Sequence, residues 1–320
     1  MPCYFAPIES LTDAIFRQTH HACFPGVDKY FIPFLSPTEP RAFTPKEWKE
    51  VAPKHNDGIR AVPQLLVKEA RPFLGAAAAL EELGYSEVNL NLGCPSGTVT
   101  GKGKGSGLLR DLDALRRLLD GIYDCTPIPV SIKTRIGFES AEEWTRILDI
   151  FRDYPIHELI IHPRTRRQAY RGEVDGDAYA AAFEAVKAPL VCNGDLFSPE
   201  DVRGLYARYP GFSAMMLGRG LVANPALVRE LNGGPALTLG ELKAYHDRLC
   251  DAYMATGNSV LALVRLRETA YYTARCFENP HKPWKVMRKA RTLAEYLDGA
   301  KHLFDEHALL DKPYFSNWEC

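Results

Sequence analysis

The sequence predicts a closed (β/α)8 barrel followed by a small all-helical domain. Short apolar segments alternate with helical patterns over about 240 residues, and this alternation indicates a parallel sheet. Eight such units fit a closed barrel better than an open doubly wound sheet. No Gly-x-Gly-x-x-Gly motif opens the first helix, which disfavours a dinucleotide-binding domain. We expect the barrel over residues 1–238 and helices alone over residues 239–320.

Each expected strand is a short apolar run that ends in polar residues or glycine. The runs lie at residues 3–7, 30–35, 59–66, 88–92, 129–134, 158–162, 189–192 and 214–217. Helices are expected to begin near Ala14 and after Ser140, where capping residues precede them, and to cover residues 71–84 and 111–123. The proline-rich stretch 36–53 gives no clear assignment.

Composition is that of an ordinary globular chain. The 320 residues are 46% hydrophobic and carry a formal net charge of -1, so no overall nucleic-acid signature is present. The eight cysteines, at positions 3, 23, 94, 125, 192, 250, 276 and 320, form no Cys-x-x-Cys pair. This spacing argues against a metal site and a disulfide scaffold, so we expect reduced thiols and a cytoplasmic protein. Without a signal-like N-terminus or a long apolar run, neither secretion nor membrane insertion is expected.

The most informative stretch is 88–109, where a strand pattern brings Asn91 and then Cys94 to its C-terminal end. A glycine-rich segment with Lys102 and Lys104 follows, and we expect an irregular, flexible loop able to approach a phosphate-rich ligand. Free cysteines are mostly small buried residues. A cysteine between a strand end and a loop, however, occupies a place where catalytic groups concentrate.

A barrel gathers all strand C-termini on one face. The polar residues expected there are Gln64, Asn91, Cys94, Lys133, Arg135, His162, Asn193 and Arg219. The turns 193–195 and 218–220 follow the last two strands, where this fold commonly binds phosphate, although their glycines are also ordinary turn residues. Lys133 is costly to bury unless it meets an anion or an electron-rich ring such as a flavin edge. His162 is expected either in that pocket or in a structural hydrogen bond to the backbone.

These residues resemble the tRNA-dihydrouridine synthases in order and spacing over nearly the whole chain. The matching blocks are Ala6-Pro7, Gln64, Asn91-Leu-Gly-Cys-Pro-Ser96, Lys133-Thr-Arg135, His162-Pro-Arg-Thr165, Asn193-Gly-Asp195 and Gly218-Arg-Gly220. The Asn-x-Gly-Cys-Pro-Ser element is specific to that family. The loop 97–109 looks most like that of the bacterial enzymes acting at uridine 16.

The resemblance implies a barrel that binds flavin mononucleotide (FMN) and reduces a uracil of tRNA at the expense of NADPH. It makes Cys94 the acid that protonates uracil C5 while reduced flavin gives hydride to C6, and a thiol of ordinary pKa is protonated at neutral pH. It places the substrate at Asn91 and Arg135. The implied flavin contacts are Ala6, Pro7, Ile8, Gln64, Lys133, His162, Asn193, Gly194, Asp195, Gly218 and Arg219.

Some positions depart from the family pattern. The family usually has Met at Ile8 and Gly at Ser10, which leaves the flavin contact of the first loop open. It commonly has Asp at Asn89 and Lys at Gly97, which leaves one RNA contact open.

The region from Arg265 to Arg291 is basic, with eight lysines and arginines against two glutamates, and aromatic residues are interleaved. A solvated helix face is the ordinary explanation of such a run. Beside a pocket for a base of folded RNA, a surface that follows phosphates is preferred, with Lys285 and Arg288 among its contacts.

Two alternatives stay open. One is an FMN-dependent barrel oxidoreductase acting on a free pyrimidine or enone, such as a dihydroorotate dehydrogenase or an ene-reductase. The other is a tRNA-binding folding factor without essential chemistry. A monomer is expected. The sequence does not give the modified uridine or the preference between NADPH and NADH.

Overall fold

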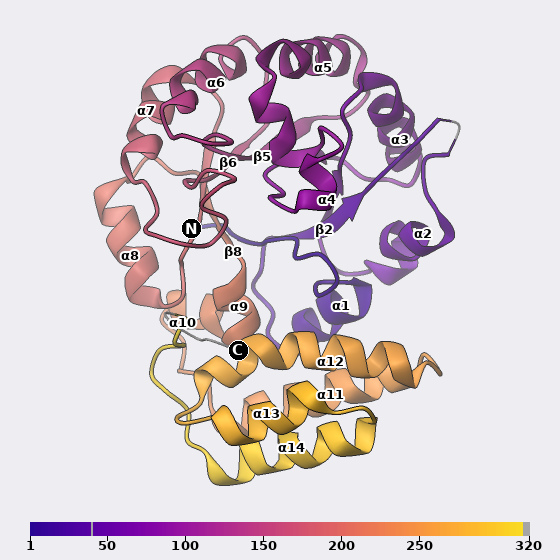
Figure 1. The fold of residues 1–320 in the computed structure, drawn as a ribbon, viewed down its shortest axis with the longest axis vertical. Helices are drawn as coiled ribbons and strands as arrows, with labels where there is room; N and C mark the ends of the chain where they lie inside the picture. Colours follow the sequence, from indigo (N-terminus) through magenta and orange to yellow (C-terminus); the bar gives the residue numbers. More distant parts are fainter. Residues whose placement is uncertain (40, 316–320) are drawn as a thin grey trace. The chain divides into compact units, whose positions relative to one another are not determined.

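The computed structural model describes residues 1–39 and 41–315. The described residues form eight parallel strands that pair in sequence order and close into a barrel, which confirms the predicted fold (Figure 1). The strands are β1 Cys3–Phe5, β2 Lys29–Leu35, β3 Ala61–Leu65, β4 Val88–Leu92, β5 Val130–Arg135, β6 Leu159–His162, β7 Leu190–Asn193 and β8 Ala214–Leu217.

Helices connect the strands and fill the C-terminal region. Those before residue 239 are α1 Ala14–Cys23, α2 Pro45–Val51, α3 Ala70–Glu82, α4 Gly97–Thr100, α5 Leu112–Cys125, α6 Glu143–Phe151, α7 Asp177–Ala185, α8 Pro199–Arg208, α9 Arg219–Ala223 and α10 Leu227–Leu231. Those after it are α11 Leu239–Met254, α12 Ser259–Thr273, α13 His281–Lys289 and α14 Leu293–Glu306. Short 3-10 turns lie at Pro53–His55, Gly105–Arg110 and Ala274–Cys276. None of the described helices is both long and apolar enough to cross a membrane.

The chain divides into two compact units that interleave in sequence. Among the described residues, the barrel unit comprises residues 1–7, 28–194 and 206–216, and the helical unit comprises residues 8–27, 195–205 and 217–315. Within the helical unit, α1 packs against α11, and Tyr253 of α11 donates a hydrogen bond to Asp13 at 3.0 Å. The assignment of catalysis to residues 1–238 and of RNA recognition to residues 239–320 stays a prediction about roles. Cys320 lies outside the described residues.

Helix starts follow capping chemistry. Asp13 accepts a hydrogen bond from the Phe16 amide at 3.0 Å, and Asp111 accepts one from the Ala114 amide at 2.9 Å. The helix α2, which falls in the stretch left unassigned, begins with a reciprocal capping box between Thr44 and Glu47. The spacing Thr-Pro-x-Glu was therefore a usable signal for this helix.

The expectation of an irregular, flexible segment after Cys94 is wrong. Residues 97–100 form α4, and residues 105–110 form a 3-10 turn that is buried over most of its length. The glycines allow close packing here: a Cβ at Gly107 would lie 2.8 Å from the carbonyl oxygen of Thr100. Small size, rather than mobility, is the property of glycine that this segment uses.

The barrel interior contains an apolar cluster and, at the N-terminal ends of the strands, a charged group. An apolar cluster includes Phe31, Val62, Ile160 and Val191. At the N-terminal ends of the strands, the ammonium of Lys29 donates to Glu87 and to Glu158, each at 2.7 Å. Lys29 is 2% exposed, and the pair of carboxylates offsets the cost of burying its charge.

Replacing Lys29 with Met is expected to lower the free energy of unfolding by about 3 to 5 kcal/mol, because the buried carboxylate of Glu87 and the partly buried carboxylate of Glu158 then face each other without a cation. Urea unfolding monitored by circular dichroism at neutral pH measures the loss. The control is Arg116→Met, which breaks the surface pair with Asp153, where both side chains are 46% exposed. That variant should lose no more than about 1 kcal/mol. Equal small losses in both variants would contradict the structural role of Lys29.

Candidate active site

The alternation of the strands brings most of the predicted pocket residues to one end of the barrel. Asn91 pairs in register with Lys133, Arg135 with His162, and Asn193 with Met216. His162 and Asn193 have the same parity as the core residues Ile160 and Val191 of their strands, and the register extends this inward orientation to Arg135, Lys133 and Asn91. Seven of the eight residues expected in the ring lie within the barrel unit, whereas Arg219 belongs to the helical unit.

Cys94 is held by its backbone on both sides. The Asn91 side-chain oxygen Oδ1 accepts hydrogen bonds from the amides of Gly93 at 3.0 Å and Cys94 at 2.9 Å. The carbonyl oxygen of Cys94 accepts from the hydroxyl of Ser106 at 2.7 Å and from the Ser106 amide at 3.2 Å. The thiol is partly exposed, so a fixed backbone presents an accessible sulfur. Sequence reasoning missed Ser106, for which no local pattern provides a signal.

Gln64 and Asn91 are linked to each other and are buried. The Asn91 amide Nδ2 donates to Gln64 Oε1 at 2.7 Å. Gln64 is 1% exposed and Asn91 is 6% exposed. The predicted contacts of Gln64 with flavin and of Asn91 with substrate stay predictions, and the structure adds a second task, the support of the turn that carries Cys94.

Lys133 is an amine without a partner. No hydrogen bond or ion pair joins its Nζ to another of the described residues. Burial, and then the positive charge of Arg135, lowers the pKa of Lys133 to about 7. A partly buried amine without a partner is costly, so this position suits a ligand that brings an acceptor or a negative charge.

Arg135 ties two loops together. Its guanidinium donates to the carbonyl oxygens of Gly93 at 2.9 Å, Thr165 at 2.9 Å and Ala169 at 2.8 Å. The side chain is 1% exposed. Substrate contact by Arg135 stays a prediction, whereas its structural role is to fix the loop after β4 against the loop after β6. Arg166 adds a second link that sequence reasoning missed, because it donates to the carbonyl oxygen of Pro95 at 3.2 Å.

His162 is held in one tautomer. Its Nε2 lies 3.2 Å from a guanidinium nitrogen of Arg164, which is buried and also donates to the carbonyl oxygen of Gly172 at 2.6 Å. A guanidinium has no acceptor, so Nε2 accepts and the ring proton is on Nδ1. With Nε2 facing this guanidinium, Nδ1 is the nitrogen of His162 that can donate at the end of β6.

The loops after β7 and β8 approach closely within the helical unit. A Cβ at Gly220 would lie 2.2 Å from the carbonyl oxygen of Leu196, so only glycine fits at this position. The guanidinium of Arg219 lies 2.6 Å from the carboxylate of Asp195 and packs over the ring of Phe197, with 5.2 Å to the centroid. Gly218 precedes α9 as its N-cap. In the barrel unit, Asn193 donates to the carbonyl oxygen of Met216 at 2.8 Å, and Gly194 has a φ of 130°.

The conformation of the first loop shows why glycine, the usual residue of the family, suits position 10. Ser10 has a φ of 65°, a left-handed conformation that glycine adopts without strain. Ile8 precedes it in a tight turn, in which the Ile8 amide donates to the Thr12 hydroxyl at 2.9 Å. Ala6 is buried at the end of β1, while Pro7 is partly exposed.

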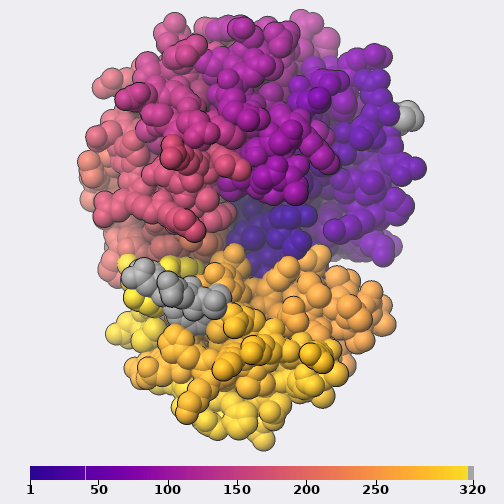
Figure 2. All heavy atoms as spheres, in the orientation of Figure 1, coloured from indigo at the N-terminus to yellow at the C-terminus, as the bar shows by residue number. Residues whose placement is uncertain are grey.

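The basic run from Arg265 to Arg291 does not form one surface. Arg265 is 8% exposed and pairs with Asp13 at 3.1 Å, and Arg275 is 4% exposed. The interpretation as a continuous RNA-facing run is therefore wrong for these two residues. The exposed basic side chains are Lys282, Lys285 and Lys289 on α13 and Arg291 just after it, with Arg288 half-buried beside them. The helices of residues 239–306 form the orange and yellow surface in the space-filling view (Figure 2).

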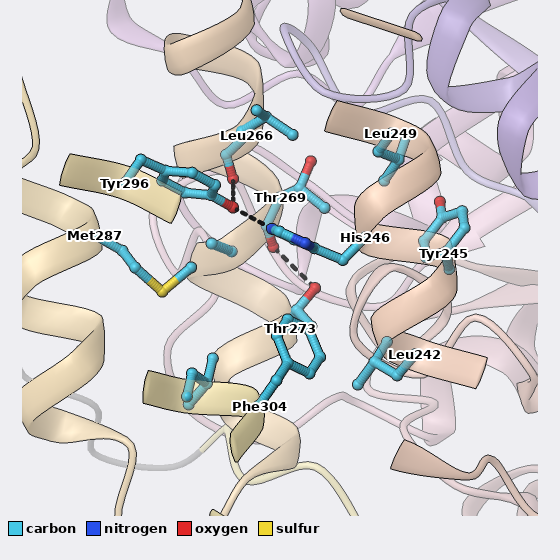
Figure 3. Close-up of a pocket in the computed structure, with 12 residues that line it drawn as sticks. Leu242, Tyr245, His246, Leu249, Leu266, Thr269, Thr273, Met287, Tyr296 and Phe304 are labelled. Atoms are coloured by element: carbon cyan, nitrogen blue, oxygen red, sulfur yellow. Dashed lines mark hydrogen bonds between the residues drawn. The ribbon is translucent and has the colours of Figure 1, made fainter. Parts of the chain in front are cut away.

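The cavities described in the helical unit differ in size. One lies among α11, α12, α13 and α14 and has a volume of about 10 Å³ (Figure 3). Its lining is mostly apolar, and the ring of His246 lies 3.1 Å from the hydroxyl of Tyr296. Because of its small volume, this cavity holds at most one water molecule. A second cavity of about 570 Å³ is lined by residues 275 and 277–281 together with Leu310, Lys312 and Tyr314. Among the described residues, no three His, Cys, Asp or Glu side chains are grouped to bind a metal ion.

The fold and the ring of polar side chains at one end of the strands define a (β/α)8-barrel enzyme with a cysteine at the end of its fourth strand. The model of the dihydrouridine synthase family matches residues 4–308. The chain therefore belongs to the dihydrouridine synthase family.

Curated relatives cover most of the chain. It is 30% identical to the tRNA-dihydrouridine synthase B of Vibrio vulnificus strain CMCP6 over 253 residues, which cover 75% of this chain and 76% of that protein. It is 31% identical to the tRNA-dihydrouridine synthase B of Serratia marcescens over 252 residues, which cover 74% and 72%.

Solved structures support the fold at low sequence identity. The old yellow enzyme homologue from Zymomonas mobilis matches with a TM-score of 0.53 and 12% identity, covering 74% of this chain and 90% of that one. Morphinone reductase in complex with tetrahydroNAD matches with a TM-score of 0.51 and 13% identity, covering 74% and 87%. At these identities the likeness concerns the barrel alone.

The lowered pKa of Lys133, about 7, predicts a pH-dependent stability of the ligand-free protein. Between pH 7 and the ordinary lysine pKa of about 10.4, the unfolded chain binds a proton that the folded chain lacks, so stability rises with pH. Lys133→Met removes this cost. The variant should exceed the wild type in free energy of unfolding at about pH 6, and its advantage should shrink as the pH rises through 7 toward 10.

Urea unfolding at a series of pH values measures this difference. The exposed Lys102→Met variant is the control and should show no such trend. A Lys133→Met advantage that is absent or constant with pH would contradict the burial of a charged amine.

Proposed function

We propose that this protein reduces uridines of tRNA to 5,6-dihydrouridine, with FMN as cofactor and NADPH as reductant. The observation that carries the proposal is the partly exposed thiol of Cys94, fixed through its backbone by Asn91 and Ser106 next to the unpartnered amine of Lys133. Membership of the dihydrouridine synthase family and the names of the curated relatives support uridine in tRNA as the substrate.

The donor set fits a flavin. Lys133 supplies a cation for the pyrimidine edge of the ring, where charge develops on reduction, and His162 supplies the Nδ1 proton. By the resemblance, Ala6, Pro7, Ile8, Gln64 and Asn193 contact the cofactor as well. By the resemblance, Gly194, Asp195, Gly218 and Arg219 contact the phosphate of the cofactor. When bound, the flavin supplies the hydride that reaches uracil C6.

Cys94 provides the other half of the addition. As hydride arrives at C6, charge develops on the uracil ring, and a thiol donates its proton to C5. The contacts of Asn91 and Ser106 with the backbone of Cys94 restrict the position of its sulfur. The thiol is therefore oriented for proton donation and needs no further activation. Arg135 and Arg166 hold the surrounding loops in place by backbone contacts.

The RNA is bound by exposed charge. A base in folded tRNA has to leave its stack before it enters an enzyme pocket, at a cost of a few kcal/mol that contacts elsewhere offset. The exposed lysines of α13, together with Arg288, supply such contacts with phosphates. We place the enzyme in the cytoplasm as a monomer, and the resemblance of the loop 97–109 favours uridine 16 as its target.

Two other functions make different predictions. A barrel oxidoreductase for a free pyrimidine or enone would keep its activity when tRNA is added in excess. A tRNA-binding folding factor would complement a deletion strain with Cys94 replaced. Mapping dihydrouridine in tRNA from cells with and without the gene tests the proposed function directly and identifies the position.

Replacing Cys94 with Ala is expected to separate the two half-reactions. Reduction of the flavin by NADPH should persist, because that hydride does not pass through the cysteine. Reduction of tRNA should fall by about 10² or more, the usual contribution of a general acid. Stopped-flow absorbance of the flavin measures both rates.

The control for this experiment is Cys125→Ala, at an exposed cysteine of α5. It should match the wild type in both half-reactions. Equal tRNA reduction by the Cys94 variant and the wild type would remove Cys94 from the mechanism.

Replacing Lys285, Arg288 and Lys289 together with Gln is expected to weaken tRNA binding and flatten its dependence on salt. The slope of log affinity against log salt should fall by up to about 0.9 for each phosphate that the variant no longer neutralises. Filter binding over a series of salt concentrations measures it. A variant with Lys46, Lys49 and Lys54 changed to Gln loses the same charge from exposed positions at and beside α2. If both triple variants change binding equally, the α13 surface is not a specific RNA contact.

A further inference from the structure

A chain of buried side chains runs through the barrel from its base to the turn of Cys94. Ser131 donates its hydroxyl proton to Glu87 Oε1 at 2.7 Å, and Asn89 Nδ2 donates to Ser131 Oγ at 2.9 Å. Gln64 Nε2 donates to Asn89 Oδ1 at 2.7 Å, and Asn91 Nδ2 donates to Gln64 Oε1 at 2.7 Å. We call Glu87, Ser131, Asn89, Gln64 and Asn91 the interior chain. All five side chains are no more than 6% exposed.

Every donor in the interior chain points toward Glu87. Lys29 donates to the other carboxylate oxygen of Glu87 at 2.7 Å, so Glu87 is an ion-paired carboxylate and accepts only. Ser131 must therefore donate to it and accept from Asn89. The same reasoning passes to Gln64 and Asn91, because an amide that uses its nitrogen on one side presents its oxygen on the other.

The last amide of the interior chain faces the catalytic turn. Since its nitrogen is taken by Gln64, Asn91 presents Oδ1 to the amides of Gly93 and Cys94. A reversed amide would set NH2 hydrogens against those two N–H groups. The orientation of Asn91 is thus dictated through three intervening side chains.

We propose that Glu87 is a positioning residue for Cys94, acting through the interior chain to fix which atom of Asn91 faces the turn. Its consequence for catalysis rests on the proposed function, whereas its consequence for the position of the sulfur does not. Ser131, Asn89 and Gln64 transmit the effect and need not touch the substrate uracil to do so.

Glu87→Gln is the discriminating substitution. Lys29 can only donate, so it attracts the new amide oxygen, and the new NH2 group then faces Ser131. Ser131 then accepts and turns its proton toward Asn89, which reverses each amide up to Asn91. The Gly93 and Cys94 amides lose their acceptor and the turn loosens.

Glu158→Gln is the matched control. Glu158 accepts from the same Lys29 at the same 2.7 Å, and it accepts from the hydroxyl of Tyr4 rather than from a member of the interior chain. Both substitutions remove one carboxylate charge from the base of the barrel. Their effects on stability are therefore expected to be similar, and their effects on the Cys94 turn are not.

The readout is the rate at which iodoacetamide alkylates Cys94 in the folded protein, followed by peptide mass spectrometry, with exposed Cys125 as the internal reference. Glu87→Gln should accelerate alkylation of Cys94 by at least about tenfold, the factor that corresponds to losing one of the two hydrogen bonds that Asn91 Oδ1 accepts at the turn. Glu158→Gln should match the wild type. Equal rates at Cys94 in the two variants would overturn the proposal.

Ser131→Ala is a second variant, which tests the proposal on its own if Glu87→Gln does not fold. This variant cuts the interior chain without disturbing Lys29, and it should also accelerate alkylation of Cys94. In the Ser131→Ala background, Glu87→Gln should add nothing at Cys94, because the two residues act in series. An unchanged Cys94 rate in Ser131→Ala, or additive effects in the double variant, would overturn the proposal. Since alkylation needs neither flavin nor tRNA, a failure of the proposed function would appear separately, as loss of tRNA reduction in the wild type.

Discussion

Closure of eight parallel strands forces every second residue into the interior of the barrel, where a polar side chain needs a partner. Asn89 and Asn91 on β4 are both buried by this rule, although their alternation with apolar residues also fits a half-exposed strand. Their partners come from β3 and β5, the neighbouring strands. The polar ring at the strand ends is therefore the upper region of a hydrogen-bonded interior rather than an isolated lining.

Strand positions could be predicted well because the apolar runs of a parallel barrel are short and punctuated. Each of the eight predicted runs overlaps an observed strand, with ends displaced by at most two residues. The sequence could also place four polar residues at one end of the barrel, because each lies near the C-terminus of a predicted strand. They are Gln64, Asn91, Lys133 and His162. Local spacing also contained the capping box of α2, which the prolines around it obscured.

Other features depend on contacts between residues far apart in sequence. Ser106 meets Cys94 because the glycine segment folds back on itself, and a run of glycines does not distinguish close packing from disorder. The burial of Arg265 follows from the position of Asp13, more than 200 residues earlier, so charge counting along α12 could not detect it. Glu87 and Ser131 gave no signal because neither residue type is unusual at the start of a strand.

The interior chain also limits which of its residues can be replaced without a compensating change at another. An aspartate at position 89, which the family resemblance would lead one to expect, accepts on both oxygens and would itself orient Gln64. Ser131 would then be drawn to position 89 as well as to Glu87. With asparagine at position 89, the only carboxylate of the interior chain is Glu87 at its base. Positions 87, 89 and 131 should accordingly covary among homologues. In each homologue we expect a carboxylate at one position of the interior chain, which sets the direction of its hydrogen bonds.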